Sequence, residues 1–149
     1  MLITNHVLGG ALVGLATPKP ATAFALGIAS HVAMDVTPHW GNEDRGVFLR
    51  VAVVDGLVGL ATMAYVARLT PSVRRTAVLA GMLGACLPDA DKPSQLFFGF
   101  SPFPAAVDRF HNVIQRESTG RLPQEAAVAA LQLVAFGAVL RRAARGPGR

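Results

Sequence analysis

The sequence predicts an all-α protein, built as an antiparallel bundle of about five apolar helices. Hydrophobic residues make up 52% of the 149 residues and charged residues only 15%, against about 25% charged in an ordinary soluble domain. No segment alternates polar and apolar residues with the period of a strand, and alanine, leucine, valine and glycine dominate the apolar runs. Runs of this composition, at the short edge of a membrane span, predict transmembrane helices.

Prolines and charged residues divide the chain into helical segments. A proline cannot continue a helix, and the residue before it is pushed out of the helical region. Five long helices are therefore predicted, at Leu2–Ala16, Ala21–Val36, Val47–Leu69, Ser72–Leu87 and Gln124–Arg142. One short helix, Ala105–Arg116, lies in the fourth connector. These helices form a single domain over residues 1–142, and the basic segment 143–149 is predicted to be a disordered tail.

The distribution of basic and small residues fits a bundle in a membrane. Basic residues gather in the first connector, around the end of the third helix and after the last helix, at Lys19, Arg68, Arg74, Arg75, Arg141, Arg142, Arg145 and Arg149. Because basic connectors stay in the cytoplasm, the C-terminus is predicted to be cytoplasmic and the N-terminus outside. Alternatively, the arginines only aid solubility or contact anionic lipid. Gly10 and Gly14 form a pair that permits close helix approach.

The stretch Ser30–Trp40, SHVAMDVTPHW, places two metal-ligand side chains on one helix face. His31 and Asp35 are four residues apart, so their Cβ atoms lie about 5–6 Å from each other. An up-and-down topology brings other ionisable residues to the same end of the bundle, namely His6, Asp55, Asp89 and Asp91. A carboxylate held away from water must be paired, hydrogen-bonded or bound to a metal. One polar cluster at one end is therefore expected.

Imidazoles and carboxylates together suit a divalent transition metal, most of all zinc, as one or two ions. The single cysteine excludes a thiolate cluster. In DRFHN, Asp108 and His111 share a face of the short helix, which could fold over the cluster. The expected metal ligands are His6, His31, Asp35, Asp89 and His111, the last as a ligand or a lid residue. Asp55 or Asp91, whichever does not bind metal, is expected to be the catalytic general base.

Each of these residues also has a structural interpretation. A buried histidine such as His6 is often an ordinary core residue, and Asp55 could pair with Arg50. LPDADKP could be an ordinary turn, and His39 with Trp40 could lie at the membrane interface. The joint occurrence of so many ligand types at one end favours metal binding over these readings.

Four stretches of the sequence together resemble a known family. MLITNHVLGGALVG, SHVAMDVTPHWG, LPDADKP and RFHNVIQRE resemble the bacterial membrane-bound metal-dependent hydrolases, the family that includes the DNA-damage-regulated inner-membrane protein YdjM. The resemblance spans most of the chain and implies a multi-pass protein of the bacterial inner membrane with a hydrolytic metal centre. The family's N-terminal histidine falls on His6, its proline–aspartate element on Asp89 and Asp91, and its later histidine on His111.

The element from His31 to Asp35 is also similar to the helix-borne zinc ligands of the zinc-dependent phospholipase C and P1 nuclease group. This chain departs from that group because it is shorter, has only four histidines, and carries Gln115 where a further histidine would be expected. One or two metal ions are therefore expected in place of three.

These observations predict a membrane-embedded metal-dependent hydrolase, in which a metal-activated water attacks a phosphoester or other ester. A site at the lipid–water boundary, toward the outer face, suggests a lipid head group or another small ester as substrate. No nucleophile elbow, phosphate-binding loop or nucleic-acid module is visible, so nucleic acid is not an expected partner. Two alternatives stay open: a membrane protein that holds or carries a metal without hydrolysis, and a soluble helical bundle with a polar core network.

Overall fold

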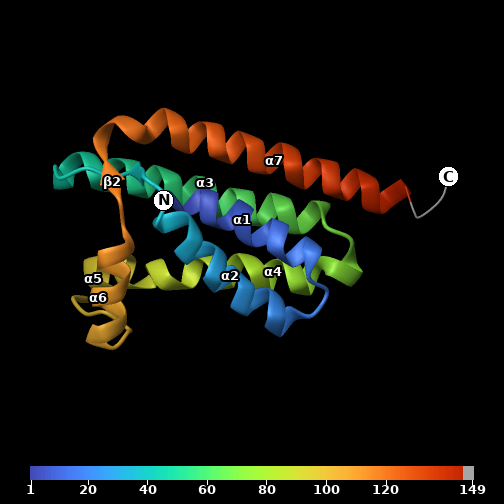
Figure 1. Ribbon diagram of the computed structural model, residues 1–149, viewed down its shortest axis with the longest axis horizontal. Helices are drawn as coiled ribbons and strands as arrows, with labels where there is room; N and C mark the ends of the chain where they lie inside the picture. Colours follow the sequence, from blue (N-terminus) through green and yellow to red (C-terminus); the bar gives the residue numbers. More distant parts are fainter. Residues whose placement is uncertain (146–149) are drawn as a thin grey trace.

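The computed structural model describes residues 1–145 and confirms the all-α class (Figure 1). Five long helices make up most of the chain: α1 (Ile3–Ala16), α2 (Pro20–Asp35), α3 (Arg45–Leu69), α4 (Ser72–Cys86) and α7 (Leu122–Arg145). Each boundary lies within three residues of the predicted one. Pro20 is the first residue of α2, a position where the missing amide hydrogen of proline is not needed.

The fourth connector holds more structure than the sequence predicts. A 3-10 turn, η1 (Leu87–Ala90), continues α4 and leads into α5 (Asp91–Phe98), while α6 (Ala105–Ile114) is the predicted short helix. The prediction of a single short helix in this connector was incomplete, because α5 is a second one. Pro93 lies in the first turn of α5, where proline is tolerated.

A pair of two-residue strands also joins the connectors. β1 (His39–Trp40) pairs in parallel with β2 (Glu117–Ser118), and η2 (Thr119–Arg121) leads from β2 into α7. At the other end, α7 continues to Arg145, so residues 143–145 are helical where the sequence predicts the start of a disordered tail. The rest of that predicted tail, 146–149, lies outside the described residues.

Helix α1 is the centre of the bundle. It packs against α2, α3, α4 and α7, and α2 packs against α4 as well. The backbones of α1, α2 and α4 meet at Gly10, Gly27 and Gly81, because a Cβ atom on Gly10 or Gly27 would overlap the carbonyl oxygen of Gly81. The predicted close approach at Gly10 and Gly14 is confirmed, since a Cβ on Gly14 would overlap the backbone of Val78.

Helices α3 and α7 expose long apolar surfaces. Among the described residues, two helices are long and apolar enough to cross a membrane, Arg45–Leu69 and Thr119–Ala143. A core helix of the same composition would be mostly buried, whereas only 11% and 6% of their most apolar stretches are buried. Helices α1, α2 and α4 have 14, 16 and 15 residues, fewer than the roughly 20 that a span requires. By length and composition, two described helices could therefore cross a membrane, where the sequence predicts about five spanning helices.

Candidate metal centre

Four side chains converge at the end of the bundle where α1 begins and α2 and α4 end. His31 and Asp35 come from α2, Asp89 from η1 and His111 from α6, and one ligand atom of each lies within 4.8 Å of the others. His31 Nε2 is 2.9 Å from Asp35 Oδ2 and 3.2 Å from His111 Nε2. His111 Nε2 is 3.3 Å from Asp35 Oδ2 and 3.6 Å from Asp89 Oδ1. We call these four residues the His/Asp cluster; they confirm the predicted polar cluster.

His6, in the first turns of α1, borders the cluster. Its Nε2 lies 3.2 Å from Asp35 Oδ1 and 3.8 Å from Asp89 Oδ2, and its ring stacks on that of His31 with centroids 4.0 Å apart. The side chain is fully buried, and within residues 1–145 neither ring nitrogen makes a hydrogen bond of acceptable geometry. Such orphaned buried nitrogens are rare, and beside two carboxylates they suit a bound cation.

The glycine contacts explain why these residues meet. His6 lies one turn before Gly10 in α1, and His31 lies one turn after Gly27 in α2. Since both glycines contact Gly81 of α4, the two histidines stand at the same level as Ala85, one turn after Gly81. The carbonyl oxygen of Ala85 is 2.8 Å from His31 Nδ1. The close backbone contact at these glycines therefore sets the position of the site.

That hydrogen bond fixes the tautomer of His31. A carbonyl oxygen can only accept, so His31 Nδ1 carries the hydrogen and Nε2 of the neutral ring presents a lone pair. This lone pair faces the Asp35 carboxylate at 2.9 Å, and two acceptors so close repel unless a proton or a cation lies between them. Metal-bound histidines commonly donate their other ring nitrogen to a backbone carbonyl in this way. The donor set of imidazole nitrogens and carboxylate oxygens fits a divalent transition metal.

Lys92 and Gln115, which sequence reasoning did not assign to the site, lie beside the cluster. Lys92 Nζ donates to Asp89 Oδ1 at 2.6 Å, and the Gln115 amide lies 3.0 Å from His111 Nε2. With its amide oriented to suit its neighbours, Gln115 accepts from Lys92 Nζ at 2.8 Å and donates to Glu117 Oε1 at 2.7 Å. The spacing of Asp89 and Lys92, three residues apart in sequence, was the available signal for this pair.

Asp89 and Lys92 hold each other in their charged forms. Burial raises the pKa of the Asp89 carboxyl, but the Lys92 ammonium together with His6 and His31 outweighs burial, so this pKa lies below its ordinary value. Burial lowers the pKa of Lys92, but the carboxylates of Asp89, Asp91 and Asp35 together outweigh burial, so the lysine pKa lies above its ordinary value. Lys92 therefore stays positively charged at neutral pH beside the His/Asp cluster.

The structure brings the five predicted metal ligands together but not the two predicted catalytic carboxylates. Asp91 Oδ1 lies 3.9 Å from His111 Nδ1, on the ring edge that faces away from the cluster. This is the position of a carboxylate that orients a metal-binding histidine. Asp108, which shares α6 with His111, instead accepts a hydrogen bond from Ser101 Oγ at 2.9 Å.

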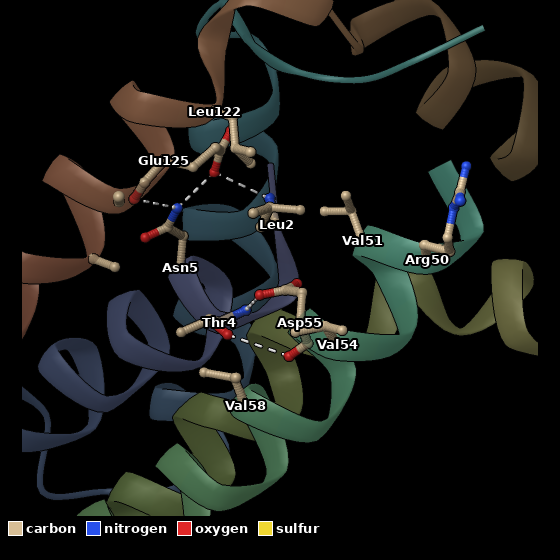
Figure 2. Close-up of a pocket in the computed structure, with 12 residues that line it drawn as sticks. Leu2, Thr4, Asn5, Arg50, Val51, Val54, Asp55, Val58, Leu122 and Glu125 are labelled. Atoms are coloured by element: carbon tan, nitrogen blue, oxygen red, sulfur yellow. Dashed lines mark hydrogen bonds between the residues drawn. The ribbon is translucent and has the colours of Figure 1, made fainter. Parts of the chain in front are cut away.

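Asp55, a residue of α3, contacts the first residues of α1 (Figure 2). Its Oδ2 accepts the Ile3 amide hydrogen at 2.5 Å, and its Oδ1 lies 3.4 Å from the Thr4 nitrogen. The residue that precedes α1, Leu2, has no polar side chain to cap the helix, so Asp55 supplies the cap from α3. This placement favours a structural role. The alternative partner, Arg50, donates instead to the carbonyl oxygen of Gly46.

A second buried carboxylate, Glu125, ties α7 to the same region. Its Oε2 accepts from Asn5 Nδ2 at 2.6 Å and from the Leu2 nitrogen at 3.2 Å, and its Oε1 accepts from the Trp40 nitrogen at 2.9 Å (Figure 2). Sequence reasoning missed Glu125, whose signal was a lone carboxylate in the first turn of an apolar helix. Trp40 is buried, so it does not lie at a membrane interface as one alternative supposed.

His39, the remaining histidine, is not part of the cluster. Its Nδ1 lies 2.8 Å from the carbonyl oxygen of Thr37, and its backbone nitrogen donates to the carbonyl oxygen of Arg116. The side chain is buried, and it serves the strand pair that closes the connectors over this end of the bundle.

Comparison with known proteins finds no match: no family model, no curated protein and no solved structure is similar to this chain. The class of protein therefore follows from the fold and the residues of the site, without a known relative. It is an all-α protein with a buried His/Asp cluster that could hold a metal ion.

Proposed function

We propose that the protein is a membrane-embedded metal-dependent hydrolase that cleaves a phosphoester or other ester, with a lipid head group as one candidate. The observation that carries the proposal is the convergence of His31, His111, Asp35 and Asp89, from three elements far apart in sequence, within 4.8 Å. His6 would complete the ligand set for one or two ions, of which zinc suits these donors best. A bound ion of this kind would lower the pKa of a water molecule toward neutrality and polarise the ester oxygen.

The residues around the cluster would divide the remaining work. Asp89 is the cluster residue that lines the neighbouring cavity, and the carboxylate oxygen of Asp89 that does not bind the ion would accept the proton of the attacking water. The Lys92 ammonium would neutralise an anionic oxygen of the ester, and Asp91 would orient His111. As the water oxygen bonds to phosphorus or the acyl carbon, the ester bond breaks, and the leaving oxygen takes a proton from solvent.

The exposed apolar faces of α3 and α7 support the membrane location, since a soluble monomer rarely exposes contiguous apolar patches beyond a few hundred Å². Both helices run in the same direction, away from the end of the bundle that holds the cluster (Figure 1). Arg68, Arg141 and Arg142 are near the C-terminal ends of these helices. With basic residues in the cytoplasm, the cluster would face outward, as expected for a bacterial inner-membrane protein of the family that the sequence resembles.

A non-catalytic metal site is the second candidate. His31, Asp35 and His111 are 0%, 0% and 4% exposed, and a closed, buried ligand set is typical of a structural metal. Only turnover distinguishes this candidate from the hydrolase.

The test is elemental analysis and hydrolysis with protein purified in detergent. We expect about one or two equivalents of zinc, and hydrolysis of a chromogenic phosphomonoester, phosphodiester or carboxylester that chelation abolishes and added zinc restores. Bound metal without turnover on all three ester classes would favour the structural role, and protein without bound metal would contradict both candidates.

A further inference from the structure

A large amphipathic cavity lies against the metal centre. Its volume is about 1040 Å³, at the upper end of the roughly 300–1,000 Å³ of ordinary ligand sites. One wall is the apolar face of α3, which contributes Val53, Leu57, Leu60 and Met63. We call this space the α3 cavity.

Polar groups of the metal centre form another part of the lining. Asp89, Lys92 and Gln115 all line the α3 cavity, so the cluster's positive side chain opens into the same space as the apolar wall. Along α3 the lining extends from Arg45 to Met63, about five turns or 27 Å at 1.5 Å per residue. The cavity therefore offers a cation next to an elongated apolar surface.

We propose that the α3 cavity binds the hydrocarbon chain of an amphiphile whose phosphate-ester head lies at Lys92, and that such amphiphiles are the substrate class. An anionic head fits at this point of the lining, because the Lys92 ammonium opens into the cavity and a divalent ion held by Asp35 and Asp89 would add positive charge beside it. Arg45 and the Met1 ammonium also line the cavity, with Asp55 and Glu117 as the other lining carboxylates. The apolar wall favours a chain, since each buried methylene contributes about 0.8 kcal/mol, or roughly a four-fold gain in affinity. The assignment as substrate rests on the proposed function, whereas the binding itself does not.

The single tryptophan of the chain provides the readout. Trp40 lines the α3 cavity, and bromine quenches tryptophan fluorescence on contact. The probe is dodecyl phosphate brominated next to the head group, because Trp40 stacks on Phe48 at the start of α3, at the Lys92 end of the cavity. It is titrated into protein held in an unbrominated neutral detergent. We expect saturable quenching, tightening with chain length from octyl to dodecyl. Brominated dodecyl maltoside, which has a neutral head, should quench only weakly and without saturation.

Two variants test the two halves of the site. Gly56 lines the cavity, and a Cβ atom built on it meets nothing within 4 Å, so Gly56→Phe should fill the cavity without disturbing the helices. Gly120, also with open space around its Cβ and outside the cavity lining, provides the matched control Gly120→Phe. Gly56→Phe should weaken dodecyl phosphate binding about ten-fold, as expected when a few methylenes lose their contacts; Gly120→Phe should not. Lys92→Gln should weaken it to a similar degree through loss of a charged hydrogen bond.

The outcomes separate this inference from the proposed function. Saturable binding that both variants weaken, in a protein without turnover, would support the binding site and contradict the hydrolase. Hydrolysis without saturable quenching, or quenching that Gly56→Phe leaves unchanged in folded protein, would overturn the inference alone. The other possible occupant of the cavity is a second copy of the chain, and light scattering tests for it. A dimer that Gly56→Phe converts to a monomer, with quenching unchanged, would assign the cavity to that second copy. Gly56→Leu repeats each measurement should the phenylalanine variant fold poorly.

Discussion

At the residue scale, the site depends on a histidine whose orientation is set by the main chain. His31 donates from Nδ1 to the carbonyl oxygen of Ala85, an acceptor that no side-chain substitution at Ala85 removes. Its Nε2 is thereby directed at Asp35 and His111. A ring held in this way loses little freedom on binding metal, which raises the affinity of a site built from so few ligands.

Replacing His31 or Asp35 with alanine should abolish stoichiometric metal, because each loss removes a ligand and leaves the remaining charges poorly balanced. The measurement is elemental analysis of detergent-purified protein, with circular dichroism to confirm that the helices persist. His39→Asn is the matched control, since His39 is equally buried but lies outside the cluster, and it should retain the metal. Unchanged metal content in folded His31→Ala and Asp35→Ala proteins would assign the cluster a purely structural role.

Asp55 is the residue for which the structure gives a different expectation from the sequence. Asp55→Ala should lower the free energy of unfolding by about 0.5–2 kcal/mol, as loss of a helix cap does, while the metal content stays unchanged. Asp55→Asn keeps an acceptor for the amide of Ile3 and should be milder. Denaturant unfolding with parallel metal analysis checks both. If Asp55→Asn instead removes the metal or the activity from a well-folded protein, the general-base role expected from the sequence would be restored.

At the element scale, packing of α1, α2 and α4 at three glycines decides where the ligands stand. The crossing lies one turn from His6, from His31 and from the carbonyl of Ala85. Helices that touch through backbone atoms can shift little along or around each other. The positions of the metal ligands therefore depend on the glycine contact and not on the loops that join the helices.

Gly81→Ala should lower both stability and metal affinity, because its Cβ would overlap the carbonyl oxygen of Gly10 and force α1 away from α4. Thermal unfolding and zinc titration measure the two effects. The control Gly56→Ala has open space for its Cβ and should be neutral or stabilising by up to about 1 kcal/mol through helix propensity. A Gly81→Ala protein as stable and as tightly metal-bound as the parent would show that the crossing does not set the site.

At the scale of the whole molecule, the two helices that do least for the core present the largest apolar surfaces. The core is built mainly from α1 and α4, with Val66 of α3 and Phe136 of α7 as the main contributions of the outer helices. Most of the apolar side chains of α3 and α7 are exposed, among them Val54, Val58, Leu131 and Val134, which lie outside the lining of the α3 cavity. In lipid such a surface needs no further cover.

The protein should remain with the membrane fraction through high-salt and carbonate washes, because apolar contact with lipid does not depend on charge. A reporter fused to the C-terminus should be active in the cytoplasm, as the arginines after α7 predict. A soluble lysate protein of similar charge provides the wash control. Release by either wash would remove the integral assignment and favour a soluble bundle that covers α3 and α7 by self-association.

The sequence by itself determined the helices and the end of the bundle at which the ligands gather. Prolines, glycines and charged residues mark where helices stop, and the helical period with an up-and-down topology puts His6, His31, Asp35 and Asp89 at one level. Only the tertiary structure decided which of the ionisable residues at that level meet. The rotation of each helix about its axis is set by contacts such as Gly10 with Gly81, which no local pattern encodes. That rotation turned Asp55 toward the start of α1. The folding of the fourth connector brought Lys92, outside any predicted helix, and Gln115, within the predicted helix Ala105–Arg116, to the cluster.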